Sequence, residues 1–215
     1  MKNGKTIELK NLLSRDIYYH IFYPQKPPSC IEKWNNIFNK KLEWQSIFRK
    51  IFVHKLVDRK RIDFHWKVIH RAIYTEHRLQ KMGQSNGLCK ICNQNDETLC
   101  HLIFDCSHAK NVWKNIEVYI MNKCGRTINL TKEVVLFGIS VNDKELDIII
   151  NLLIYETKWQ IWKNRNCVKY GNKIALSYRQ IFQNVLNEIK LMIGIISKNV
   201  LLNKCSLEIL CNAVN

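Results

Sequence analysis

The sequence predicts a mainly α-helical fold. Its 215 residues include only seven glycines and three prolines, and 47% of them are hydrophobic. The scarcity of turn-forming residues disfavours a turn-rich β-sandwich, and the hydrophobic content is ample for a packed core. Apolar side chains also recur at the i, i+3, i+4 spacing that places them on one face of a helix. These three observations favour helices over strands.

The first helical pattern begins near Ile31, after an irregular lead-in that ends in prolines. Helical spacing there predicts a core-facing stripe of Trp44, Ile47, Phe48, Ile51 and Phe52. A second helix is predicted from Ile62 to Lys81. We expect its packing face to consist of Ile62, Trp66, Ile69 and Ile73. Gly83 and Gly87 then predict a turn.

Three more helices are predicted in the C-terminal half. Ser107 is a suitable cap for the first of them, and Gly125 is a suitable end. Its apolar positions at helical spacing are Ala109, Val112, Trp113, Ile116 and Ile120. The second runs from Asp143 to Tyr170 and is closed by Gly171. The third runs from Ala175 to about Leu202. Its apolar stripe consists of Ile181, Phe182, Val185, Leu186, Ile189, Ile193 and Ile196.

Between these helical halves, the pattern Cys89-x2-Cys92-x8-His101-x4-Cys106 has the spacing of a zinc site. A Cys-x2-Cys turn presents two sulfurs to one ion, and a following His and Cys complete a tetrahedral set. Three thiolates and one imidazole leave no open coordination position. The spacing therefore predicts a structural Zn²⁺ and not a catalytic one.

Two neighbours of the motif, Cys100 and His108, are alternative ligands that could replace His101 or Cys106. Glu97 and Thr98 suit the first turn of a short helix, whose free N–H groups they would cap. The predicted fold is thus mainly α, with helical segments that flank a small Cys3His zinc knuckle. Its expected parts are an irregular lead-in at 1–30, a basic helical segment at 31–88, the zinc knuckle at 89–106 and a C-terminal helical bundle at 107–215.

Thirty-four Lys and Arg against eighteen Asp and Glu give a net charge of +16. Such a surplus makes polyanions the expected partners, with nucleic acid first and an anionic membrane surface second. Met1 to Lys10 is too polar for a signal peptide, and Leu191 to Ile196 is too short for a membrane span. We therefore expect an intracellular protein, nuclear or cytoplasmic, whose nine cysteines bind metal or are buried thiols.

The predicted helix over 62–81 also has a cationic face, about 130° from its packing face at 100° per residue. It consists of Lys67, His70, Arg71, Tyr74, Arg78 and Lys81. Lys and Arg neutralise phosphates and Tyr stacks on unpaired bases, so we assign this face to nucleic-acid contact. The alternative is an ordinary solvated face. Lys163 and Arg165 join the candidate contact set beside Trp159 and Trp162, which form either a stacking platform or, more commonly at this spacing, core.

Catalytic motifs are scarce in the sequence. Gly-x-Ser-x-Gly, a phosphate-cradling Gly-rich loop and His-Glu-x-x-His are all absent. Asp143, Glu145 and Asp147 could form a metal-binding carboxylate set, but acidic side chains are favoured at the positive end of a helix in any case. We expect a protein that is not an enzyme and has no small-molecule substrate.

Two stretches of the chain follow the pattern of a known family. The first joins Cys89-x2-Cys92, Glu97-Thr98-x2-His101-Leu102-Ile103-Phe104-x-Cys106 and Trp113, within roughly Lys55 to Ile116. It resembles the zinc-binding segment that follows the polymerase in LINE-type non-LTR retrotransposon proteins. The second, Lys158-Trp159-x2-Trp162-Lys163-Asn164-Arg165-Asn166, is similar to the downstream Trp-Lys-x-Arg-Asn element of that family.

The resemblance implies a module that helps a retroelement protein hold its RNA template or target DNA, with Cys89, Cys92, His101 and Cys106 as zinc ligands. It implies nucleic acid, RNA or DNA, and a reverse transcriptase as partners. The paired-aspartate motif of the polymerase is absent, so we expect no polymerase activity of its own. Two alternatives remain: a helical module that docks on a polymerase or another chain through Ile181 to Ile196, and a retroelement fragment without retained function.

Overall fold

The structure is a computed structural model that describes residues 27–53 and 58–196. It divides the chain into two compact units, residues 1–42 and 43–215. The described part of the first unit contains α2 (Ser29–Phe38), which ends at Asn39, a residue with a left-handed φ of 49°. The amide of Leu42 donates to Asn35 Oδ1 at 3.1 Å and closes the following turn. Most of the predicted lead-in at 1–30 lies outside the described residues.

All regular elements in the described part of the second unit are helices, and this part contains no strand and a single isolated bridge between Leu88 and Asp96. The mainly α prediction is therefore confirmed. The elements in chain order are α3 (Trp44–Val53), α4 (Arg59–Ile69), α5 (Glu76–Gln80), η2 (His101–Asp105), α6 (Ser107–Cys124), α7 (Lys132–Phe137), α8 (Lys144–Gly171) and α9 (Tyr178–Ile196).

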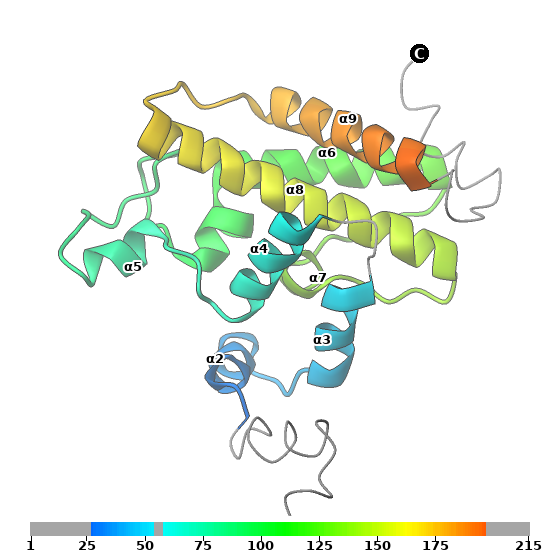
Figure 1. The fold of residues 1–215 in the computed structure, drawn as a ribbon, viewed down its shortest axis with the longest axis horizontal. Coiled ribbons are helices and arrows are strands. Elements are labelled where there is room, and N and C mark those ends of the chain that lie inside the picture. Colours follow the sequence, from blue (N-terminus) through cyan, green and yellow to red (C-terminus); the bar gives the residue numbers. More distant parts are fainter. Residues whose placement is uncertain (1–26, 54–57, 197–215) are drawn as a thin grey trace, which may run out of the picture. The chain divides into compact units, whose positions relative to one another are not determined.

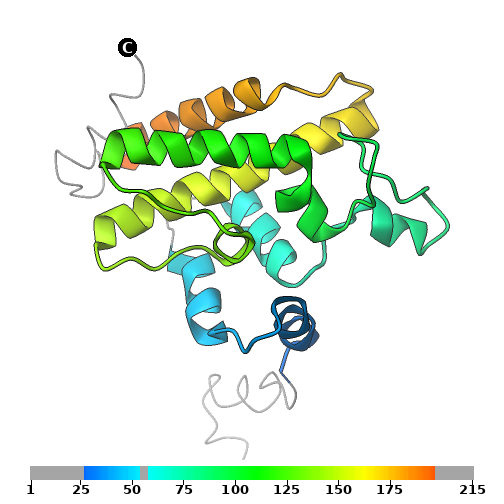
Figure 2. The same ribbon diagram turned by 180° about the vertical axis from the view of Figure 1, so that it is seen from behind.

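Three long helices, α6, α8 and α9, lie side by side and form the body of this unit (Figures 1 and 2). The helix α8 is the central one, because it contacts α4, α6, α9 and η2. Its middle turns are buried around the whole circumference, from Ile149 to Lys158. A helix that is apolar on one face only would leave its other face in water, so this burial requires neighbours on several sides.

The stripes predicted for the C-terminal helices are largely confirmed. The buried positions of α6 are Ala109, Val112, Trp113, Ile116 and Ile120, and those of α9 include Ile181, Val185, Leu186 and Ile189. Gly125 ends α6 with a φ of 61°, as expected. The helix α9 begins at Tyr178 instead of Ala175, because Ser177 and Gln180 cap each other's amides in a reciprocal capping box.

The helix predicted from Ile62 to Lys81 is wrong as a single element. The helix α4 ends at Ile69, Arg71 has a left-handed φ of 55°, and α5 begins only after Thr75. The hydroxyl of Thr75 accepts from the amide of Arg78 at 3.3 Å, and this N-cap starts a new helix. The predicted cationic side chains therefore do not share one continuous helical face.

The packing face of α4 also differs from the prediction. The buried residues of α4 are Phe64, His65, Val68 and Ile69, whereas Trp66 is 41% exposed. Phe64 contacts the rings of both Trp159 and Trp162 on α8, at centroid distances of 5.4 and 5.1 Å. The core interpretation of those two tryptophans is thus favoured, and the face of α4 is rotated so that Phe64 meets them.

The helix α7 was not predicted. It has only six residues, too few to display a periodicity, although Thr131 caps its first turn by accepting from the amide of Val134. None of the described helices combines the length and the apolar character that a bilayer crossing requires.

Candidate metal centre

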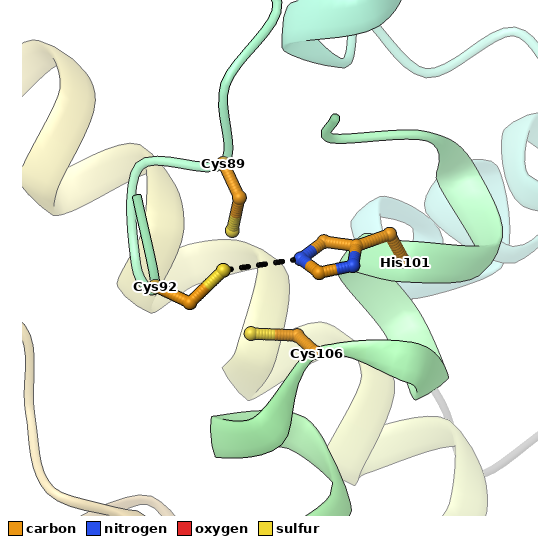
Figure 3. A group of neighbouring side chains, drawn as sticks. All are labelled: Cys89, Cys92, His101 and Cys106. Carbon is orange, nitrogen blue, oxygen red and sulfur yellow. Dashed lines mark hydrogen bonds between the residues drawn. The ribbon is translucent and has the colours of Figure 1, made fainter. Parts of the chain in front are cut away.

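The four predicted zinc ligands converge on one point in the second unit (Figure 3). Cys89 and Cys92 lie on the turn before η2, His101 is the first residue of η2, and Cys106 directly precedes α6. Their donor atoms all lie within 4.8 Å of one another, and Cys92 Sγ lies 3.4 Å from His101 Nε2. Cys92 is half-buried and the other three are buried.

The turn that carries Cys89 and Cys92 is held by its own backbone. The amide of Asn93 donates to the carbonyl of Cys89 at 2.9 Å, and the amide of Cys89 donates to the carbonyl of Asn95 at 2.9 Å. Asn93 adopts a left-handed φ of 53°, a conformation that Asn tolerates better than most residues. The amides of Ile91 and Cys92 point at the Cys89 sulfur, as expected for a turn built around a thiolate.

A π-helical turn brings His101 and Cys106 together. The amide of Cys106 donates to the carbonyl of His101 at 2.9 Å, which closes an i to i+5 bond over η2. The hydroxyl of Thr98 accepts from the amide of His101 at 3.1 Å, so the capping role expected of Thr98 is confirmed. The x4 spacing of the motif is thus one wide helical turn.

The protonation states of this cluster suit metal binding. A hydrogen bond with Cys89 lowers the pKa of Cys106 despite burial, and the amides of His108 and Ala109 at the start of α6 act in the same direction. Burial lowers the pKa of His101, which favours the neutral imidazole that binds metals. The hydrogen bond with Cys106, followed by burial, raises the pKa of Cys89. The shifts at Cys106 and His101 thus favour the ionised thiol and the neutral imidazole, the forms that bind a metal, whereas the shift at Cys89 opposes its ionisation.

The donor set fits Zn²⁺. Zinc bonds of about 2.3 Å to sulfur and 2.0–2.1 Å to nitrogen place tetrahedral donors roughly 3.5–3.8 Å apart. The four donors lie within 4.8 Å of one another, so small side-chain adjustments suffice. The alternative ligands are not part of this group. His108 Nε2 lies 2.7 Å from the carbonyl of Leu176, and Cys100 is outside the cluster.

Glu97 forms the base of the knuckle, a role that the sequence did not reveal. It was expected to cap a short helix, but its buried carboxylate accepts from the amides of Glu76 and Lys90, at 3.0 and 3.3 Å. It also accepts from the guanidinium of Arg165. One carboxylate therefore joins α5, the turn of the knuckle and α8.

Arg165, predicted to contact nucleic acid, has a different position. It is 1% exposed, and its guanidinium donates to Glu97 at 2.9 and 2.6 Å and to Glu76 at 2.6 Å. A buried guanidinium held by two carboxylates is not accessible to phosphates. Lys169 also donates to Glu76. The Trp-Lys-x-Arg-Asn element thus fixes the knuckle to α8 through its arginine, and the neighbouring Lys163 is the exposed cation.

The remaining predicted contact residues surround the bend between α4 and α5. Tyr74 is 55% exposed, and the Arg78 guanidinium lies 4.8 Å from the centre of its ring. Arg78 also donates to the carbonyl of Arg71 at 3.2 Å. Lys67 pairs with Asp63 at 2.5 Å, and Lys81 is exposed. The bend therefore gathers Arg71, Tyr74 and Arg78 at the surface.

Residues 29–113 match the family described as zinc-binding in reverse transcriptase. The chain is also similar to the transposon TX1 uncharacterized 149 kDa protein of Xenopus laevis, with 27% identity over 146 residues. That match covers 66% of this chain and 10% of the relative, so the chain corresponds to about a tenth of the relative's length. No solved structure matches the chain significantly.

Proposed function

We propose that the chain is a zinc-stapled, nucleic-acid-contacting accessory segment of a retroelement protein, since residues 29–113 match the family described as zinc-binding in reverse transcriptase. We propose further that it has no polymerase or other enzyme activity of its own. The observation that carries the proposal is the convergence of Cys89, Cys92, His101 and Cys106 on one point within the short segment 89–106. With all four positions filled by protein, the ion has no open site for a substrate.

The ion in this proposal acts as a crosslink. It would join the Cys89–Cys92 turn to η2 and to the start of α6, where Cys106 lies. The Glu97 carboxylate continues this connection to Arg165 on α8. A short segment with little hydrophobic core of its own gains most from such a crosslink, because metal binding then contributes to the free energy of folding.

The proposed contact with nucleic acid rests on charge and accessibility. The net charge of +16 attracts a polyanion over long range. Lys81 and Lys163 are exposed, and Lys67 shares its charge only with the exposed Asp63. Contacts of this kind bind phosphates and give affinity without sequence specificity. The partner is therefore RNA or DNA, alongside the reverse transcriptase of the same element.

The competing proposal of a docking module has lost part of its basis. Its apolar stripe was expected to be available to another chain, but Ile181, Val185, Leu186 and Ile189 are buried. The helix α9 packs against α6 and α8. This part of the stripe is therefore already occupied within the chain.

The decisive experiment measures bound zinc and RNA affinity in the same preparations. We expect one zinc per chain by elemental analysis, and an affinity for a single-stranded RNA that falls steeply with salt. Cys106→Ser should lose both the zinc and the ordered knuckle. Cys124→Ser is the matched control, because Cys124 is a half-buried thiol on α6 outside the cluster. A protein that folds without zinc and ignores RNA at low salt would contradict the proposal.

A further inference from the structure

Two exposed aromatic side chains, Trp66 near the end of α4 and Tyr74 just before α5, each contact a neighbouring side chain. The Trp66 and His70 rings are stacked, with centroids 4.1 Å apart and planes inclined by 24°, and Trp66 remains 41% exposed. The Arg78 guanidinium covers the Tyr74 ring in the same manner, while 55% of Tyr74 is exposed. Both rings are thus held in place and accessible at the same time.

The two pairs are connected through the backbone of the bend between α4 and α5. Arg78 donates to the carbonyl of Arg71, the residue that follows His70 in the chain. The Tyr74–Arg78 pair is therefore bonded to the backbone directly beside the Trp66–His70 pair. We call this set the aromatic strip: Trp66, His70, Arg71, Tyr74 and Arg78.

The charges around the aromatic strip are mainly positive. Arg59, Lys60 and Lys81 are exposed cations on the same two helices or directly beyond α5. The acidic residues between 59 and 81 are Asp63 and Glu76. Asp63 pairs with Lys67, and Glu76 is buried against Arg165 and Lys169. Residues 59–81 therefore carry more exposed cations than exposed carboxylates.

We propose that the aromatic strip binds a single-stranded nucleic acid by stacking unpaired bases on Trp66 and Tyr74. This inference rests on the proposed function and specifies its ligand. In a duplex the base faces are covered by their neighbours, whereas an unpaired strand presents them to aromatic rings. The Arg78 guanidinium covers the Tyr74 ring and Arg71 directly follows His70 in the chain, so cations accompany both rings and would neutralise the phosphates that connect such bases. His70 and Arg78 support the rings, so little freedom is lost on binding.

The test compares the affinity of two variants for short labelled RNAs by fluorescence anisotropy. The first is Trp66→Leu with Tyr74→Leu, and its control is Tyr170→Leu, an aromatic residue that is 66% exposed at the end of α8. Loss of stacking should weaken binding to a single-stranded 12-mer by about tenfold or more, because one stacked base contributes about 5- to 150-fold. The salt dependence should be unchanged, because no phosphate contact is removed. The control should bind as the wild type does.

Two further arms separate stacking from other causes. An RNA strand with abasic positions should bind the wild-type protein weakly. The double Leu variant should bind this strand with the same low affinity as the wild type. Trp66→Phe with Tyr74→Phe keeps both rings and should restore most of the affinity, which a general folding defect would not allow. Zinc content serves as a folding check for each variant.

The outcomes distinguish this inference from the proposed function. If the double Leu variant binds the 12-mer as tightly as the wild type, or if a duplex of equal length binds equally well, the aromatic strip is not a stacking site. Salt-dependent binding would then still support phosphate contact. If the wild-type protein binds no RNA and no DNA at low salt, the proposed function itself fails.

Discussion

Arg165 on α8 donates two hydrogen bonds to Glu97 at the base of the knuckle, 2.9 Å from Nε and 2.6 Å from Nη2, although 68 residues separate them. Both side chains are at most 1% exposed. Two charges removed from water are stable only when their hydrogen bonds are nearly complete. Glu76 and Asn166 accept the other guanidinium hydrogen bonds, and the amides of Glu76 and Lys90 donate to the Glu97 carboxylate. The orientation of the knuckle on α8 is therefore fixed by a buried ionic network as well as by the zinc ligands.

Replacing Arg165 by methionine should destabilise the protein strongly. The substitution leaves Glu76 and Glu97 buried without their shared partner, and such a loss costs about 3–5 kcal/mol. Urea unfolding followed by circular dichroism measures the change. Lys163→Met, on an exposed neighbour, should stay within about 0.5 kcal/mol of the wild type. Equal stabilities of the two variants would show that the network contributes nothing.

Substitutions at neighbouring cysteines should separate ligands from bystanders. Cys89→Ser should abolish tight zinc binding, because a serine oxygen is a poor substitute for a thiolate. Cys100→Ser should retain one zinc per chain, since Cys100 lies outside the cluster. His108→Ala should also retain it, because the imidazole of His108 faces the carbonyl of Leu176. Elemental analysis after dialysis against a weak chelator measures all three. Zinc loss in Cys100→Ser or His108→Ala would return those residues to the ligand set.

Local patterns allowed much of this fold to be predicted. The Cys89-x2-Cys92-x8-His101-x4-Cys106 spacing correctly predicted the cluster, since a zinc knuckle is formed by a short continuous segment. The recognition of a reverse-transcriptase zinc-binding segment is likewise confirmed by the family match at 29–113. The stripes of α6 and α9 were visible because those helices are long enough to repeat their pattern.

Features that depend on distant partners could not be predicted. A run of basic residues led to the expectation that Arg165 lies at the surface. Only the folded chain shows that the carboxylates of Glu76 and Glu97 surround it. The exposed position of Trp66 has the same origin, because packing of Phe64 against α8 decides which face of α4 is buried. The break at Arg71 could have been predicted from Thr75, which is a favourable N-cap residue. The apolar periodicity continues across the break, however, and this continuity led to the prediction of one long helix.

Gly138 should tolerate no side chain. Its φ of 82° and ψ of 171° fall in a region that is essentially restricted to glycine. An added Cβ would lie 2.4 Å from Oδ1 of Asn151. Asn151 is buried, its Oδ1 accepts from the amide of Ile139, and its Nδ2 donates to the carbonyl of Ile139. We therefore expect Gly138→Ala to lower the free energy of unfolding by about 3 kcal/mol.

The control for this substitution is Gly125→Ala. Gly125 has a φ of 61°, and its Cβ would meet nothing within 4 Å. Only the strain of a left-handed backbone conformation applies there, and it costs about 1 kcal/mol. Urea denaturation of both variants measures the difference. If both substitutions lower the free energy of unfolding by the same amount, Asn151 moves away from the added Cβ at no energetic cost.

Lys158 should make the stability of the protein depend on pH. Its side chain is 1% exposed and donates to the carbonyl of Leu136 at 3.0 Å, and burial lowers its pKa to about 7. Between pH 7 and about 10 the unfolded chain therefore binds a proton that the folded chain does not. The free energy of unfolding should rise with pH over this range, by about 1 kcal/mol per pH unit, and should be insensitive to this group below pH 7.

Lys158→Met isolates this contribution, because methionine fills a similar volume and does not titrate. The ionisation of the cysteines and the binding of zinc affect both proteins alike and cancel in the comparison. Urea titrations at pH 7.5, 8.5 and 9.5 should show the wild type gaining stability relative to Lys158→Met at each step. Parallel curves for the two proteins would mean that Lys158 keeps its proton in the folded state, with water or a carboxylate reaching its ammonium group in solution.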